Sequence, residues 1–100
     1  MKKLELILSP EVVQATAHRL RGKVQALSLC SVQEWREDGP MVVYRGLTAR
    51  SLLVPAVRME AVCYDAALEE LLRLLREVAP DREATVVTLE DTEEGVRNHG

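Results

Sequence analysis

The sequence predicts an α+β domain in which two helices cover one face of a four-stranded antiparallel sheet. Two segments, residues 10–21 and 66–78, carry apolar side chains at helical spacing. Shorter segments rich in β-forming residues flank them, and the two halves of the chain repeat the order strand, capped helix, strand. One hundred residues, 47% of them hydrophobic, suit a single domain over residues 1–100 with one core.

The first half begins with partly alternating residues 3–8, which predict a strand. Ser9-Pro10-Glu11 is typical of a helix start, with a capping hydroxyl, a proline at the first helical position and an early acid. Gly22 is a suitable C-cap for a helix over residues 10–21. We expect a second strand at about residues 24–34. The apolar stripe of the helix consists of Val12, Val13, Thr16, Ala17 and Leu20.

The second half starts with residues 36–55, which we interpret as one long loop because turn residues and polar residues interrupt it. A strand at residues 57–64 follows, and Asp65 is expected to cap the helix over 66–78. A last strand covers residues 85–89, before a polar tail over 90–100. The order is a double βαβ unit, βαββαβ, which predicts a ferredoxin-like fold. The apolar stripe of the second helix consists of Leu68, Leu71, Leu72 and Leu75.

Apolar residues on the helix-free face of this sheet predict self-association. In a strand with one solvent-exposed face, apolar and polar side chains alternate strictly. Here Ile7 lies between Leu6 and Leu8, and Val62 lies between Ala61 and Cys63. Some apolar side chains must therefore lie on the face that no helix covers, where a second subunit would bury them.

The charge and the cysteines favour a cytoplasmic protein that does not bind nucleic acid. The formal net charge is −3, whereas nucleic-acid binding needs a basic surface. Glu5 interrupts the apolar N-terminal run, and no stretch approaches the length that crosses a bilayer. Cys30 and Cys63 are expected to stay reduced. No metal site is expected, because no Cys-x-x-Cys occurs and His18 and His99 have no ligand partners at a useful spacing.

The chain carries no recognised catalytic motif, and we expect that it is not an enzyme. Nucleophile-elbow, phosphate-loop and zinc-protease patterns are absent from the sequence. A pair formed by Glu5 and Glu60 on neighbouring strands is the one candidate acid/base dyad. The alternative is that both are solvated or salt-bridged strand residues.

The loop arginines are the best candidates for ligand binding. Arginine makes paired hydrogen bonds to phosphates and carboxylates, although any one arginine is more typical of a solvated surface. Trp35 could stack on a ring or simply cover the core. The arginines outside the predicted helices are Arg36, Arg45, Arg50, Arg82 and Arg97.

Several segments resemble the PII signal-transduction family and its PII-like relatives. Tyr44-Arg45-Gly46 matches a motif of the family's long T-loop. Residues 1–10 resemble its first strand and helix start, residues 55–60 resemble the re-entry of the loop into the sheet, and residues 93–97 resemble its C-terminal segment. The resemblance spans nearly the whole chain in order.

The resemblance implies a homotrimer that binds an adenine nucleotide (ADP, AMP or ATP) between subunits and engages a partner through a T-loop at residues 36–54. The partner would be a membrane transporter or a metabolic enzyme of nitrogen or carbon metabolism. The T-loop contacts would include Tyr44, Arg45, Gly46 and Arg50. The implied nucleotide-binding positions are Ile7, Ser28, Trp35, Arg36, Val62, Arg82 and Arg97.

Departures from the family pattern imply an altered ligand. Ala49 stands where the family has a modified tyrosine, and Ala56 replaces a ligand-binding lysine. Residues 78–84 contain no glycine to bring backbone N–H groups close to phosphate. An adenine nucleotide such as ADP or AMP, or a small anion such as bicarbonate, is then the expected effector, and no firm cofactor is expected. The alternative is a trimeric scaffold of PII-like or CutA-like fold that binds no small ligand.

Overall fold

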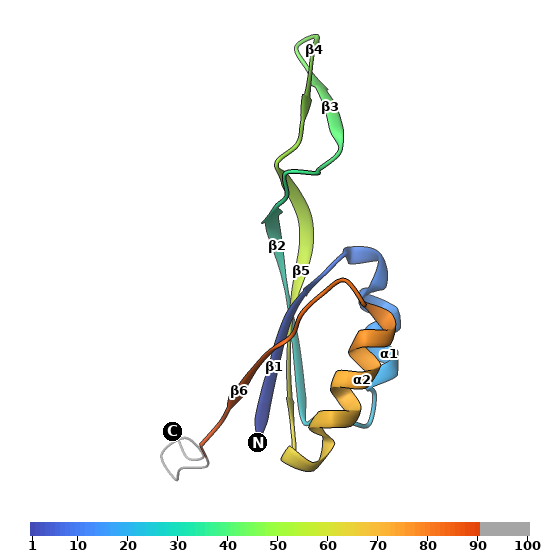
Figure 1. Ribbon diagram of the computed structural model, residues 1–100, viewed down its shortest axis with the longest axis vertical. Coiled ribbons are helices and arrows are strands. Elements are labelled where there is room, and N and C mark those ends of the chain that lie inside the picture. The colour runs from blue at the N-terminus through green and yellow to red at the C-terminus, as the bar shows by residue number, and fades with distance from the viewer. Residues whose placement is uncertain (91–100) are drawn as a thin grey trace.

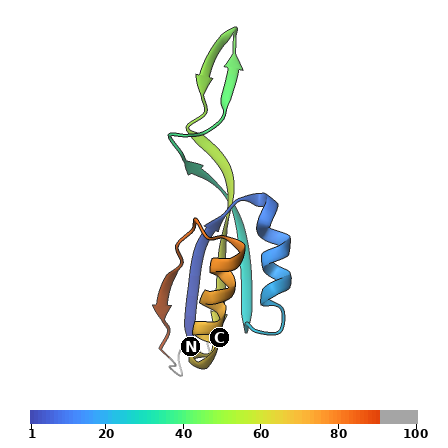
Figure 2. The same cartoon turned by 45° about the vertical axis from the view of Figure 1, so that its right-hand side comes forward.

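The structure is a computed structural model that describes residues 1–90, and it confirms the predicted α+β fold (Figure 1). Four antiparallel strands form a sheet in the order β2-β5-β1-β6, the ferredoxin-like arrangement. Both helices cover the same face of this sheet (Figures 1 and 2). The elements are β1 (Lys2–Leu8), α1 (Val13–Leu20), β2 (Ala26–Trp35), β3 (Met41–Tyr44), β4 (Leu47–Arg50), β5 (Leu53–Cys63), α2 (Leu68–Val78) and β6 (Thr85–Thr88).

The core lies between the sheet and the two helices. Because side chains alternate along a strand, every second residue of β1 from Leu4 onward points at the helices and is buried. Leu71 and Leu75 of α2 are buried against these strand residues, as their helical spacing predicts. The buried cluster consists of Leu4, Leu6, Leu8, Leu20, Met59, Cys63, Leu71, Leu74, Leu75 and Ala79.

Both helices begin with a 3₁₀ turn, and the two predicted side-chain caps are wrong. Pro10–Val12 precedes α1, and the Ser9 carbonyl, not its hydroxyl, accepts a hydrogen bond from the Val12 amide at 3.1 Å. Asp65 belongs to the 3₁₀ turn before α2, and its carboxylate forms an ion pair with the Met1 ammonium at 3.0 Å. The charged partner draws the carboxylate away from the backbone N–H groups that it would otherwise cap. Hydrogen bonding to the ammonium also lowers the pKa of Asp65.

A long β arm, residues 35–53, replaces the irregular loop that was predicted. β2 continues to Trp35, β5 begins at Leu53 rather than at residue 57, and β3 and β4 form a hairpin between them. Arg45 and Gly46 have φ angles of 54° and 78°, as a two-residue hairpin turn requires. The arm projects away from the helices and gives the molecule a long dimension of 58 Å (Figure 1).

The helix-free face of the sheet carries half-buried apolar residues, as predicted. Ile7 and Val62 lie on this face, on β1 and β5. Val87 of β6 pairs with Lys3 and lies on the same face, where its side chain is exposed. Between them, Arg58 lies 3.5 Å from a Glu5 carboxylate oxygen. This face is therefore a mixture of apolar side chains and cross-strand ion pairs.

Candidate functional site

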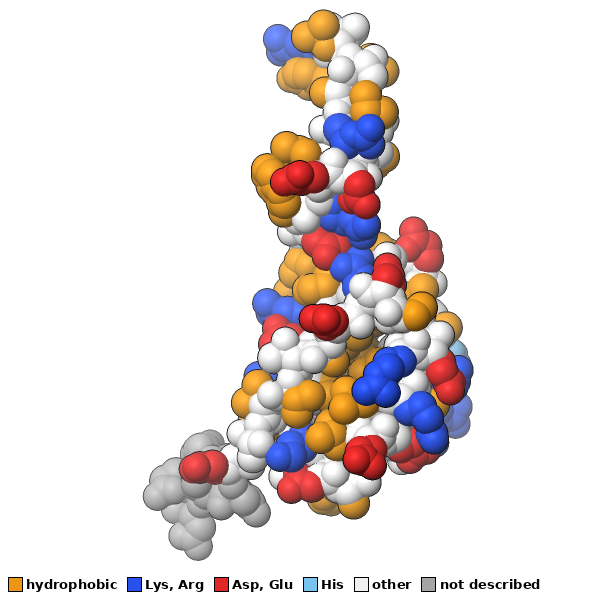
Figure 3. Space-filling view, viewed as in Figure 1, with side chains coloured by type: hydrophobic (Ala, Val, Ile, Leu, Met, Phe, Trp, Pro, Cys, Tyr) orange, Lys and Arg blue, Asp and Glu red, His pale blue; other side chains and the backbone are white. Residues whose placement is uncertain are grey.

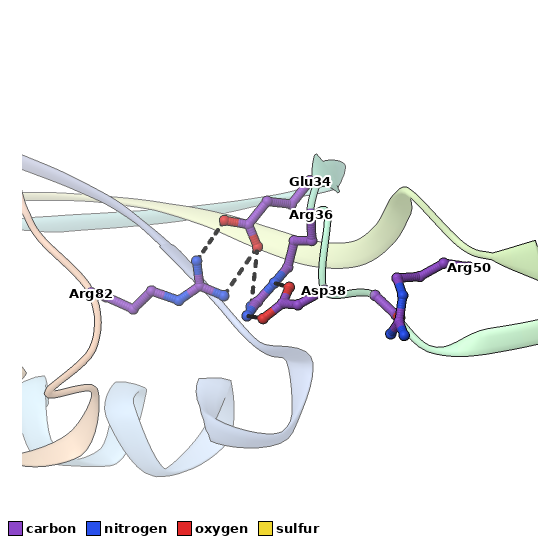
Figure 4. A network of polar contacts seen from close by, with 6 residues as sticks. Glu34, Arg36, Asp38, Arg50 and Arg82 are labelled. Atoms are coloured by element: carbon purple, nitrogen blue, oxygen red, sulfur yellow. Dashed lines mark hydrogen bonds and ion pairs between the residues drawn. The ribbon is translucent and has the colours of Figure 1, made fainter.

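The strongest polar cluster lies where the arm leaves the body. Arg82, in the connection between α2 and β6, donates two hydrogen bonds to the two carboxylate oxygens of Glu34 on β2, at 2.5 and 3.0 Å (Figure 4). The Arg82 side chain is only 13% exposed and that of Glu34 is 25% exposed. Paired hydrogen bonds of this kind are stronger than a single contact and fix the orientation of both groups.

A second guanidinium lies beside the first. Arg36 donates from Nε and Nη2 to the two oxygens of Asp38, both at 3.0 Å, and its Nη1 lies 4.0 Å from Glu34. Glu34 therefore lies between two arginines from different parts of the chain (Figure 4). We call Glu34, Arg36, Asp38 and Arg82 the arm-base cluster.

The charges of the cluster shift one another's proton affinity. The hydrogen bond from Arg82 holds the pKa of Glu34 below its usual value, and the same contact raises the pKa of Arg82. Likewise, Arg36 lowers the pKa of Asp38, whereas Asp38 raises the pKa of Arg36. Both carboxylates are therefore ionised at neutral pH, and the two arginines are already paired with anions.

Close backbone packing fixes the start of the arm next to this cluster. The Arg36 amide donates to the Leu52 carbonyl at 2.8 Å, and the Ser51 amide donates to the Pro40 carbonyl at 2.7 Å. Arg50 donates from Nη1 to the Gly39 carbonyl at 2.9 Å. A Cβ at Gly39 would lie only 1.9 Å from the Ser51 carbonyl oxygen, so the close approach requires glycine.

The structure separates the predicted nucleotide-binding residues into distinct groups. Arg36 and Arg82 meet through Glu34 at the arm base. By contrast, Ile7 and Val62 lie at different heights on the helix-free face, because Ile7 pairs with Arg58 and Val62 pairs with Lys3.

Two more predicted positions lie on β2, and one lies outside the described residues. Ser28 lies on the exposed edge strand opposite Glu60. Trp35, at the end of this strand, is 63% exposed and covers no core. Arg97 lies outside residues 1–90, so the structure does not place it.

The predicted partner-binding residues lie along the β3–β4 hairpin. Tyr44 ends β3, and the turn Arg45-Gly46 connects it to β4. The Arg45 guanidinium lies 5.4 Å from the centre of the Tyr44 ring, within the range of a cation–π contact. Arg50 lies at the other end of the hairpin, where it binds the arm-base backbone. Three of these residues thus form the exposed tip, while the fourth supports its base.

The candidate dyad Glu5 and Glu60 is brought together on the sheet. The two residues pair across β1 and β5. Arg58 lies 3.5 Å from one carboxylate and 3.8 Å from the other. The arrangement is an ion-paired strand cluster, which is the alternative to a catalytic dyad given above.

Sequence reasoning missed the role of Glu34. The sequence pattern predicts only the end of a strand at Glu34, and its partner Arg82 lies 48 residues later. Its position beside Trp35 and Arg36 was the only local signal. Among residues 1–90, no group of three or more His, Cys, Asp or Glu side chains could hold a metal ion. No helix in the same range combines the length and apolar character needed to cross a membrane.

The fold and the long β arm together define a protein of the PII-like, CutA-type fold. No family model matches the sequence, and no curated protein matches it. Solved structures do match. A PII-like protein CutA from Nostoc has 18% sequence identity and a TM-score of 0.63, covering 96% of this chain and 85% of that one.

Two further solved structures share the fold over nearly their whole length. A DUF3240 family protein from Shewanella baltica has 14% identity and a TM-score of 0.67, covering 91% of each chain. A CutA1 from Pyrococcus horikoshii has 13% identity and a TM-score of 0.67, covering 96% of this chain and 90% of that one. At these identities the likeness establishes the fold.

Proposed function

We propose that this protein is a homotrimeric scaffold of PII-like, CutA-like fold whose arm is buried against neighbouring subunits. The exposure of the arm carries this proposal. Among the described residues 1–90, thirteen large hydrophobic residues are exposed, and eight of them belong to the arm, which carries much of the apolar surface in Figure 3. These eight are Trp35, Met41, Val42, Val43, Tyr44, Leu47, Leu52 and Leu53.

The arm has no partner layer within the described chain to bury these side chains. Val43 and Leu47 are 71% and 73% exposed, and a two-stranded hairpin alone is marginally stable in water. Exposed apolar patches of this kind mark protein–protein contacts. Half-buried Ile7 and Val62 on the helix-free face offer a second apolar surface for the same assembly.

The test is the mass of the full chain in solution, measured by analytical ultracentrifugation across a concentration series. We expect a trimer that Leu47→Glu converts to monomers. Ala15→Glu is the matched control, because it adds the same charge at an exposed position of α1. A wild-type chain that stays monomeric at all concentrations would refute the scaffold.

A second candidate, a ligand-sensing regulator, is favoured by the arm-base cluster. Arg36 and Arg82 place two guanidinium groups around one carboxylate, the geometry that arginine also uses for phosphate. In this candidate an adenine nucleotide or a small anion such as bicarbonate binds at the arm base. The arm then engages a transporter or a metabolic enzyme.

Calorimetric titration with ATP, ADP and AMP tests this candidate, each with and without bicarbonate and 2-oxoglutarate. Saturable binding that Arg82→Gln abolishes would support a sensor. If none of these compounds binds to a protein shown to be a folded trimer, only the scaffold proposal remains.

A further inference from the structure

We infer that Glu34 is an internal counter-anion that latches the arm to the body, and that a phosphate-type oxoanion competes with it for Arg82. The ligand-dependent part of this inference rests on the ligand-sensing candidate above. The latching part rests only on the contacts at the arm base. The two parts are separable by experiment.

The geometry of the pair supports competition. Both oxygens of Glu34 bind the two terminal nitrogens of Arg82, at 2.5 and 3.0 Å. Two oxygens of a phosphate would use the same two N–H groups in the same fork. Glu34 therefore occupies the position that an oxoanion bound to Arg82 would take, and the two cannot bind there together.

The net charge of the arm-base cluster also supports competition between Glu34 and an oxoanion. The arm-base cluster contains two guanidinium groups and two carboxylates, so its net charge is zero. An incoming anion gains little from Arg82 while Glu34 stays in place, because the nearby carboxylate repels it. Displacing or neutralising Glu34 leaves a net positive charge on the cluster, which favours the anion.

The location of the pair gives the competition a structural consequence. Glu34 precedes Trp35, the first residue of the arm, whereas Arg82 belongs to the connection between α2 and β6 (Figure 4). Their contact is a bridge between the arm base and the body. Its loss leaves β2–β5 pairing to join the arm to the body, because the backbone bonds of Arg36 and Ser51 connect residues within the arm itself.

The first experiment compares anion binding by wild type, Glu34→Gln and Glu37→Gln. The probes are inorganic phosphate and ATP, titrated calorimetrically into the full chain, so that a free phosphate and a nucleotide phosphate are distinguished. We expect Glu34→Gln to bind about tenfold more tightly than wild type, because the competing charge is gone. Glu37→Gln removes the same charge from an exposed neighbour that contacts neither arginine within residues 1–90 and should behave as wild type.

The second experiment measures hydrogen exchange without ligand. Glu34→Gln and Arg82→Gln should each speed exchange at the amides of Arg36 and Ser51 by several-fold, because both remove the bridge. The exchange rate of the backbone amide of buried Leu71 serves as the internal reference for global stability. Unchanged exchange in both variants would overturn the latch.

The outcomes separate the inference from the proposed function. Equal anion affinity in wild type and Glu34→Gln would overturn the competition while leaving the sensor intact. Failure of every variant to bind either probe would overturn both the competition and the ligand-sensing candidate. In that case faster exchange in Glu34→Gln would still support the latch.

Discussion

Trp35 and Leu53 pair at the last register position of β2 and β5, and both side chains face solvent, at 63% and 52% exposure. The pair marks the boundary between the body and the arm. Beyond it, no layer of the described chain covers the ribbon, which is why the apolar surface of the molecule concentrates on one side of this boundary.

Trp35 should report assembly directly, because it is the only tryptophan in the chain. If the arm is buried between subunits, the Trp35 emission maximum shifts to longer wavelength as dilution exposes the ring. Fluorescence over a concentration series measures this shift, with acrylamide quenching as a second readout. The denatured chain gives the emission of the fully exposed ring. Emission that equals it at every concentration would contradict burial of the arm.

Replacing Gly39 by alanine should disorganise the arm base. The added Cβ would lie 1.9 Å from the Ser51 carbonyl oxygen, so the backbone must move. We expect faster hydrogen exchange across residues 36–52 and little change in exchange at α2. Gly22→Ala is the control, because its cost arises from a φ of 77° in the body, far along the chain from the arm. Unaltered exchange in Gly39→Ala would show that the close approach is not needed.

The stability of the protein should fall in acid through the arm-base cluster. The pKa of Glu34 is lowered in the folded state, so its stabilising contribution is present above the unfolded value of about 4.3 and is lost as the pH falls through the folded value. Glu34→Gln should therefore be less stable than wild type above the unfolded value, with a difference that shrinks as the pH falls below it. Urea unfolding at a series of pH values on both sides of the unfolded value measures this difference. Parallel pH curves for the two proteins would contradict the assignment.

A core leucine and an arm valine should differ sharply in their effect on folding. Leu71 is fully buried, and truncating it to alanine should lower the free energy of unfolding by about 2–5 kcal/mol. Val43 is 71% exposed, so Val43→Ala should leave the unfolding of the body nearly unchanged and weaken assembly instead. Urea unfolding at a concentration where the chain is monomeric makes the comparison. Equal decreases in the free energy of unfolding for Leu71→Ala and Val43→Ala would mean that the arm and the core unfold as one unit.

The sequence was sufficient for the body because its pattern is strong. Leucines at helical spacing around Leu71 and Leu75 predict the buried face of α2, and the alternation around Leu4 and Leu6 predicts the buried face of β1. The cap at Asp65 was wrong because a tertiary contact with the Met1 ammonium, which no local pattern shows, holds its carboxylate. At Ser9 the helix begins with a 3₁₀ turn in which the carbonyl, not the hydroxyl, accepts the hydrogen bond.

The arm and its base were harder to predict. Two-residue hairpin turns favour Asn-Gly or Gly-Gly, so Arg45-Gly46 gave little sign of a turn with two positive φ angles. The Glu34–Arg82 contact joins residues 48 apart without any shared periodicity. Such a contact arises only when the fold brings β2 next to the connection after α2.

The central position of β1 has a consequence for the order in which the protein can fold. β1 is made before the other described strands, yet its two partners, β5 and β6, come from the second half of the chain. Pairing over such long sequence separations is slow, because much chain must be ordered before the contacts form. The β3–β4 hairpin, by contrast, needs only neighbouring residues. During synthesis the exposed apolar arm is therefore complete before β6 is made and before the four-stranded sheet can close.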